Sequence, residues 1–381
     1  MSAEQHAPKV LLDLLAARGP SGHEAAAAAV WTHAAASFAA STNIDVVGTP
    51  SALVPARAAA GAAPAQSPVG EAGAAPAGDA AGRPRRLVVM GHIDEIGLVV
   101  THIDEHGYLW FREVGGWDAQ ILVGQRVVLA TAAGEVSGAI GKKPIHLLRD
   151  EERKKVAEVR DLHIDVGAKD GEQAAALVRV GDVAVLDGEP LLLPNGRIVA
   201  RAMDNRLGSF VALEAARLVA EAGGADGWEL VAAAAAQEET TFGGSRTSAF
   251  ALRPDAAIVV DVTHATDAPG IDVKEAGSHD LGSGPVLSRG TTLHPALFEL
   301  LAGAGEAEGI AFTIEASGRN TGTDADAVHI SRGGVPTALV SIPLRYMHSP
   351  VELVQLDDVA ACARLIAAMA LRLGADTVLR R

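Results

Sequence analysis

Four apolar runs in the second half of the chain restrict the fold more than any other feature. They read WELVAAAAAQE, AAIVVDVTHA, AFTIEAS and PTALVSIP, and segments with helical periodicity separate them. Near-continuous apolar runs of this length are typical of strands that are buried on both faces of a sheet. Strands that alternate with helices in this way predict an α/β fold, with a central sheet flanked by helices.

A different pattern between residues 96 and 187 predicts a second module. Short strand-like runs with Gly and Asp turns follow one another there, and the helical stretches near 151–159 and 171–178 are brief. This pattern indicates a small β-rich domain. We therefore predict a main domain in two parts, residues 1–95 and 188–381, with the β-rich domain inserted at 96–187.

Residues 49–85 are rich in Ala, Pro and Gly. Such a composition cannot bury much surface or hold a helix, so we predict a flexible loop. It would join two strands, because the flanking stretches NIDVV and RLVVM are both strand-like. Two helical segments, separated by GPSG at 19–22, open the chain.

Charge and cysteine content exclude several classes of function. The formal net charge is −15 and no long basic run occurs, which argues against nucleic acid or an anionic membrane as a partner. The single cysteine, Cys362, lies in a stretch with helical periodicity, and we interpret it as an inert core thiol. Without a signal peptide or an apolar run that could span a bilayer, a cytoplasmic location is expected.

The tetrapeptide His-Ile-Asp-Glu occurs twice, at 92–95 and at 102–105. The first copy follows the buried-strand run RLVVM, and open α/β sheets place ligands at such strand ends. In an extended backbone His92 and Asp94 face the same way, and an Asp can accept the second ring N–H of a metal-binding His. The second copy lies between two strand-like runs, and DEHG is typical of a turn. We predict that His92 belongs to a functional site and His102 to a hairpin.

Further acids and a second histidine are predicted at other strand ends. Glu238 and Glu239 follow VAAAAAQ, Asp261 follows AAIVV, and His348 follows PTALVSIP, while Asp204 lies between a strand and a helix. Asp204 alone would be explained as a helix N-cap, and the paired acids as solvated residues. Two adjacent carboxylates at a buried strand end, however, repel each other unless a cation lies between them.

Together these side chains predict a site for divalent cations. Imidazoles and carboxylates without thiolates suit zinc, which is our first expectation, and also cobalt or manganese. Five candidate ligands exceed the roughly three that one catalytic zinc ion keeps, but they suit two ions that share a bridging carboxylate. The residual positive charge of two such ions would favour ionisation of a bound water at neutral pH.

The motifs and their order resemble those of the glutamyl and deblocking aminopeptidases, metallopeptidase family forty-two, which include the tetrahedral aminopeptidases. The shared stretches span nearly the whole chain: GPSGHE, GHIDEIG, GGWD, GQRV, KKPIH, IDVGA, ARAMDNR, QEE, VDVTHATDAPG, GSGPV, NTGTDAD and RYMHSPVE. The resemblance implies a metal-dependent aminopeptidase that hydrolyses peptides. It also implies a di-zinc exopeptidase-like mixed sheet, a barrel-like or PDZ-like dimerisation domain at 96–187, and self-association into dimers or dodecamers.

The resemblance also implies a ligand set when it is carried over motif by motif. Asp204 would bridge two metal ions. His92 and Asp261 would bind one ion, and Glu239 and His348 would bind the other.

The remaining roles follow from the same comparison. Glu238 would be the general base that takes a proton from water and passes it to the leaving amine. Asp94 would orient His92. We interpret His264 and Asp267 as residues that line the site rather than bind metal.

Two features depart from the family pattern. The stretch TTFGGS follows the paired acids where the family has a Val-Gly-x-Arg-Gly-like stretch, and residues 49–85 form a longer segment than expected. Arg319 and Asn320 are either substrate contacts or part of a solvated loop. Arg319 or Arg345 is the candidate for a basic pocket that would bind an acidic substrate residue. Asp324 is not expected to bind metal. The alternatives are another di-metal hydrolase, such as a deacylase or carboxypeptidase, and a non-catalytic assembly protein with a vestigial site.

Overall fold

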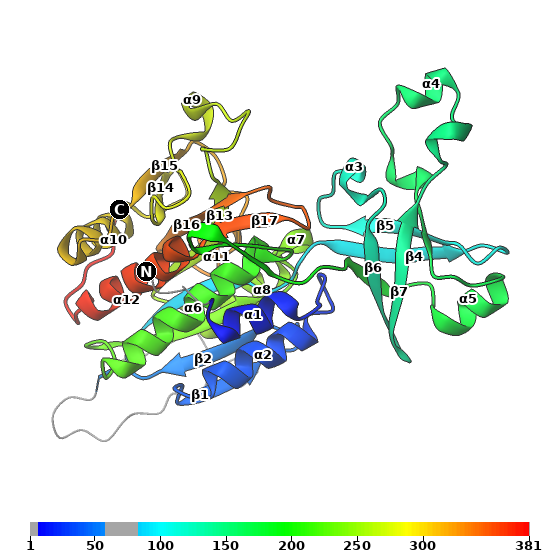
Figure 1. The fold of residues 1–381 in the computed structure, drawn as a ribbon. Helices are drawn as coiled ribbons and strands as arrows, with labels where there is room; N and C mark the ends of the chain where they lie inside the picture. The colour runs from blue at the N-terminus through cyan, green and yellow to red at the C-terminus, as the bar shows by residue number, and fades with distance from the viewer. Residues whose placement is uncertain (1–6, 58–82, 381) are drawn as a thin grey trace.

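Parallel strands form the centre of a large mixed sheet. A computed structural model describes residues 7–57 and 83–380 (Figure 1). Four strands lie side by side in the order β12 (Trp228–Ala235), β3 (Arg85–His92), β13 (Ala256–His264) and β16 (Thr337–Arg345), and they are parallel. Three of the predicted apolar runs supply β12, β13 and β16, which are buried almost throughout. This confirms the predicted α/β architecture.

Antiparallel strands extend the sheet on both sides. Beyond β12 lie β2 (Pro50–Val54) and β1 (Ser41–Ile44). Beyond β16 the order continues with β17 (Glu352–Gln355), β11 (Arg197–Ala200) and β10 (Leu191–Leu193). The sheet is therefore mixed, as expected for the fold class.

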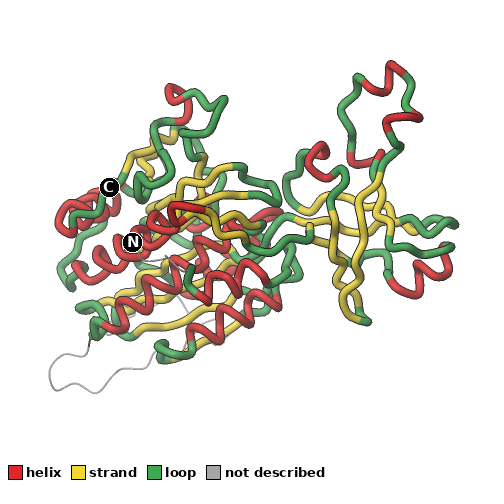
Figure 2. The backbone as a smooth tube through the Cα atoms, in the orientation of Figure 1, coloured by secondary structure: helices red, strands yellow, loops and turns green. Residues whose placement is uncertain are grey.

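Helices cover both faces of this sheet (Figures 1 and 2). One face carries α1 (Lys9–Ala16), α2 (Ala25–Ala35), α6 (Met203–Glu221), α10 (Pro295–Glu308) and α12 (Leu356–Arg372). The other face carries α8 (Gly243–Leu252) and α11 (Ala325–Val328). Because side chains alternate along a strand, Leu87 and Val89 of β3 pack into the first core and Val88 and Met90 into the second. Cys362 of α12 is fully buried in the first core, as predicted.

The β-rich module is a closed antiparallel barrel that lies to one side of the sheet (Figure 1). Its strands are β4 (Gly97–Ile103), β5 (Leu109–Val114), β6 (Arg126–Thr131), β7 (Gly134–Gly141), β8 (His163–Asp165) and β9 (Val183–Leu186). The short helices α3 (Ala119–Leu122), α4 (Asp150–Arg153) and α5 (Gly171–Leu177) connect them. Apolar side chains such as Leu98, Leu109 and Ile164 fill a core that is separate from the cores of the sheet.

Three sequence predictions were wrong in detail. Residues 50–54, inside the predicted loop 49–85, form the fully buried strand β2, because the overall composition hid the short apolar run SALV. Residues 58–82 of that predicted loop lie outside the described residues. The run AFTIEAS gives β15 (Thr313–Ser317), which pairs with β14 (Val286–Gly290) and no other described strand, so it is a half-exposed edge strand. The helix expected over 151–159 ends at Arg153.

None of the helices in the described part of the chain is both long and apolar enough to cross a bilayer.

Candidate active site

The carboxyl ends of the four parallel strands bring the predicted residues to one edge of the sheet. In the register of β3 and β12, His92 lies opposite Ala235. In the register of β3 and β13, Val259 lies opposite Met90, which places Asp261 level with His92. Asp261 therefore lies within β13, three residues before its end, rather than after it.

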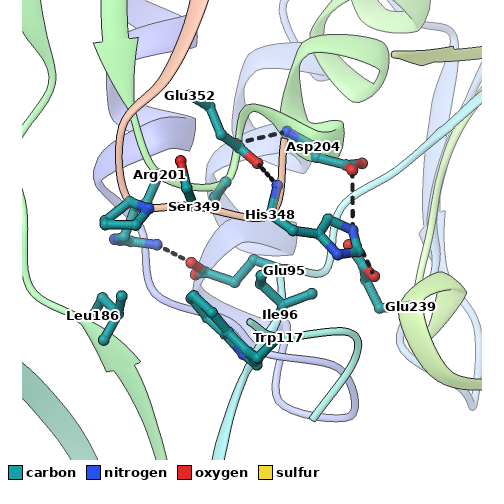
Figure 3. A pocket seen from close by; sticks show the side chains of 12 residues that line it. Glu95, Ile96, Trp117, Leu186, Arg201, Asp204, Glu239, His348, Ser349 and Glu352 are labelled. Atoms are coloured by element: carbon teal, nitrogen blue, oxygen red, sulfur yellow. Dashed lines mark hydrogen bonds and ion pairs between the residues drawn. The ribbon is translucent and has the colours of Figure 1, made fainter. Parts of the chain in front are cut away.

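Asp204 lies between the two histidines. It stands at the start of α6, where the backbone is not yet helical and the Asp204–Asn205 peptide bond is cis. Its Oδ1 atom is 3.1 Å from Nε2 of His92, and its Oδ2 atom is 3.3 Å from Nε2 of His348. Figure 3 shows His348 directed towards both Asp204 and Glu239. One carboxylate thus spans the two imidazoles.

The side chains form overlapping groups that could each hold a cation. His92, Asp204 and Asp261 offer ligand atoms within 4.8 Å of one another, and so do Asp204, Glu239 and His348. Asp204 belongs to both groups, as a bridging ligand would. A third group, His92 with the paired acids Glu238 and Glu239, overlaps the other two.

Burial and charge make this edge suited to cations. Burial, reinforced by neighbouring carboxylates such as Asp261, raises the pKa of Glu238 to about 10. Hydrogen bonds to Asp204 and Glu239 raise the pKa of His348 to about 11. The buried Oε1 atom of Glu239 has no hydrogen-bond partner among the described residues. Divalent ions would replace the protons that these groups hold and would satisfy that oxygen, so the donor set fits metal.

The barrel contributes to this site through its backbone. Nδ1 of His348 donates to the carbonyl oxygen of Gly116 at 2.8 Å, which leaves Nε2 facing Asp204 and Glu239. A Cβ atom on Gly116 would lie 3.2 Å from Nδ1 of His348, and one on Gly115 would lie 3.3 Å from Oε2 of Glu239. The two glycines of GGWD therefore allow this close approach.

Asp94 connects the first histidine to the paired acids. Its Oδ1 atom is 3.3 Å from Nδ1 of His92 and accepts from the backbone N–H of Glu238 at 3.0 Å. Its Oδ2 atom accepts from the backbone N–H of Glu239 at 3.2 Å and from the hydroxyl of Ser21. Asp94 thus holds the start of α7 (Glu238–Thr241) in place and lies beside the ring of His92. Through Ser21, the GPSG motif contacts the same carboxylate.

Glu352 is a residue of this site that sequence reasoning missed. One of its carboxylate oxygens accepts from the backbone N–H groups of Met203 and Asp204, and the other accepts from that of His348. Figure 3 shows the bonds to Asp204 and His348. It is only 2% exposed. A lone acid at the start of the apolar stretch ELVQ was the available signal, because an unpaired carboxylate is costly to bury.

A buried ion-pair network lies next to Asp94. Glu95 pairs with Arg201 and with Arg206, whose Nη2 atom is 2.9 Å from Oε1 of Glu95. Burial alone would raise the pKa of Glu95, but the two guanidinium groups outweigh it and lower that pKa. Arg206 also donates to the backbone carbonyls of Leu14 and Ala17, so the network ties α1 to the edge of the site.

A cavity of about 460 Å³ opens onto this edge. His264 lines it, as predicted, whereas Asp267 does not and instead pairs with Arg345. Arg319 and Asn320 are exposed and lie outside the lining, although the next three residues, 321–323, belong to it.

Asp324, in the stretch TGTDAD that the resemblance marks as lining the site, is a second buried acid. It is fully buried, and neither carboxylate oxygen has a hydrogen-bond partner among the described residues. Burial raises its pKa to about 6. It lies outside the three groups of candidate ligands.

Comparison with known proteins agrees with the fold and assigns the chain to a class, the metallopeptidases, which are hydrolases. The chain belongs to the M42 glutamyl aminopeptidase family, whose pattern it matches over residues 74–365. It is therefore an aminopeptidase, an exopeptidase of a family that uses divalent metal ions.

Individual relatives support this assignment. The lysyl aminopeptidase of Pyrococcus furiosus is 34% identical over 286 residues, which cover 74% of this chain and 81% of that protein. The structure of a TET aminopeptidase from a marine sediment archaeon of the Thaumarchaeota superimposes with a TM-score of 0.85 at 32% identity, and covers 97% of this chain and 96% of that one. The TET1 peptidase of Pyrococcus horikoshii, which can assemble into a tetrahedron or a large octahedral shell, gives a TM-score of 0.77 at 29% identity, with 96% of this chain and 99% of that one covered.

Proposed function

We propose that this aminopeptidase binds two divalent ions, zinc in the first place, and uses Glu238 as its general base. Asp204 would bridge the ions, with His92 and Asp261 on one side and Glu239 and His348 on the other. The observation that carries this proposal is the placement of one oxygen of Asp204 against each imidazole. When bound, the ions would polarise the scissile carbonyl and make a water molecule more acidic.

Two observations support the proposal that Glu238 is the general base. Its Oε2 atom lies 3.6 Å from Nε2 of His92, and the residue lines the cavity. Burial raises its pKa above that of an ordinary carboxyl group, and nearby cations would lower it again, towards the range in which a base works best. It would accept a proton from water and return it to the leaving amine. Asp94 would keep the ring of His92 in the tautomer that presents Nε2.

Glu238 also belongs to one group of candidate ligands, so a test must separate the role of base from the role of ligand. Replacement of Glu238 by Gln does so. We expect Glu238→Gln to keep both metal ions and to lower kcat for an aminoacyl-nitroanilide by about 10²–10⁴-fold. Metal content and turnover would be measured on the same sample, with Asp204→Asn as the comparison that loses metal as well as activity. Normal turnover of Glu238→Gln would contradict the base role, and loss of metal would make Glu238 a ligand.

We also propose that the chain self-associates, as a dimer or as a dodecamer built from dimers. Support comes from the Pyrococcus horikoshii relative, which can assemble into a tetrahedron or a large octahedral shell and aligns over 96% of this chain. The mass of the purified protein, measured by light scattering, distinguishes the monomer, the dimer and the dodecamer.

A further inference from the structure

One acidic side chain of the cavity lies outside the proposed metal centre. Glu315 is the middle residue of the edge strand β15 and lines the cavity. Its neighbours Ile314 and Ala316 are exposed, whereas Glu315 is half-buried. Because side chains alternate along a strand, the fold directs Glu315 towards the cavity and Ile314 towards solvent.

Two hydroxyl groups hold this carboxylate in place. Thr263 of β13 donates to Oε1 at 3.2 Å, and Ser288 of β14 donates to Oε2 at 3.4 Å. Ser288 is also the residue paired with Glu315 in the ladder between β14 and β15. An ionised carboxylate offers about four acceptor positions, so the two hydroxyls leave room for a ligand that donates hydrogen bonds.

The distance from the metal centre fits the reach of a long side chain. Thr263 follows Asp261 by two residues on β13, so the two side chains share one face of the strand. Two residues of a strand advance by about 6.6 Å. A substrate residue whose carbonyl lies beside Asp261 would therefore bring the end of a lysine or arginine stem close to Glu315.

The charge of the cavity favours a cation at this position. The lining residues that the structure describes include no Lys or Arg, and the candidates for a basic pocket, Arg319 and Arg345, are not among them. Two metal ions would offset the carboxylates that bind them but not Glu315. The apolar side chains of Phe242 and Met347 line the same cavity and could cover an apolar stem.

We propose that Glu315 selects peptides whose N-terminal residue is lysine or arginine, by binding the charged end of that side chain. This inference rests on the proposed function, because it assigns the substrate class of the same site. A different role, binding of the α-amino group, would make Glu315 necessary for every substrate, since all of them carry that group.

Four aminoacyl-nitroanilides, of Lys, Arg, Leu and Glu, separate these roles. The wild-type enzyme should give its highest kcat/KM with Lys or Arg. Glu315→Gln should lower kcat/KM for these two roughly 10- to 100-fold, mainly through KM, because a hydrogen bond to a charged group is lost. Its rate with Leu should change less than about twofold, which also shows that the variant is folded and metal-loaded. Glu306→Gln makes the same charge change on an exposed part of α10 and should leave all four rates unchanged.

Two further variants sharpen the test. Glu315→Asp keeps the charge and should keep the preference for basic residues, and Glu315→Lys should raise the rate with Glu relative to that with Lys. An equal loss with all four substrates in Glu315→Gln would overturn the proposal, as would a wild-type preference for Leu or Glu. Failure of the wild-type enzyme to cleave any of the four would instead overturn the proposed function, and this inference with it.

Discussion

The two copies of His-Ile-Asp-Glu have the same four residues and nearly opposite surroundings. His92, at the end of a central parallel strand, is 1% exposed and lies against Asp204. His102, on β4 of the barrel, is exposed and lies opposite Trp110 in the hairpin with β5. The tetrapeptide therefore does not determine its own surroundings; the end of the strand at which it stands does.

The two aspartates show the same contrast through similar hydrogen bonds. Asp94 accepts from the backbone of Glu238 and Glu239, which lie far away in the sequence. Asp104 accepts from the backbone of His106 and Tyr108, within its own turn. One carboxylate thus fixes tertiary structure around the site, and the other fixes a local turn.

The largest expected effect separates the two histidines. His92→Ala removes a predicted ligand of the buried group, so metal content should fall and kcat/KM should drop by at least about 10³-fold. His102→Ala removes an exposed ring and should change neither quantity. Both would be measured by elemental analysis and an aminopeptidase assay. Equal behaviour of the two variants would break the distinction drawn between the copies.

The two glutamates should differ in stability. Glu95→Gln leaves Arg201 and Arg206 buried without their partner, which should lower the free energy of unfolding by about 3–5 kcal/mol. Glu105 has an 88% exposed side chain, so Glu105→Gln should have no measurable effect. Urea unfolding of metal-free protein at a fixed concentration measures both without a contribution from metal binding.

The same pair of variants predicts a pH dependence. The pKa of Glu95 is lowered in the folded state, so its contribution is complete above the pKa of an unfolded Glu, about 4.3, and is lost as the pH falls through the lower folded value. The difference between wild type and Glu95→Gln should therefore be constant from pH 7 to pH 5 and shrink below about pH 4. A difference that does not change with pH would show that packing, not charge, accounts for it.

The smallest expected effect separates the two aspartates. Asp94→Asn keeps the shape but removes the negative charge beside the His92 ring and weakens the acceptor for two backbone N–H groups, so metal affinity or kcat/KM should fall about 10–100-fold. Asp104→Asn keeps one acceptor oxygen in its turn and should leave activity unchanged. Metal titration of the metal-free variants, followed by assay, measures this. Unchanged affinity and activity in Asp94→Asn would contradict its positioning role.

Much of this arrangement could be predicted because it depends on patterns that are local in sequence. Apolar runs that end in polar residues predicted β12, β13 and β16, together with the strand ends that carry Glu238 and His348. Parallel strands meet at one edge, so their terminal side chains converge without knowledge of the detailed packing. The turn after His102 was predictable for the same reason, since its hydrogen bonds lie within a few residues.

The contacts that could not be predicted depend on pairing between distant segments. Glu352 binds backbone groups about 150 residues away, and nothing in the stretch ELVQ specifies its partner. The burial of residues 50–54 depends on the neighbouring strand β12, which composition alone does not reveal. The direction of Glu315 depends on β15 being an edge strand that pairs with β14.

The link between His348 and the carbonyl oxygen of Gly116 has a consequence for how this enzyme can be altered. The acceptor is a main-chain atom, so no side chain at position 116 can supply it, and a side chain there would only crowd the histidine ring. If the barrel were replaced with that of a relative, His348 would keep its hydrogen bond only if the new loop placed a carbonyl oxygen at the position of the Gly116 oxygen. In a sequence alignment, the need for this main-chain hydrogen bond would be visible only as two adjacent glycines, Gly115 and Gly116.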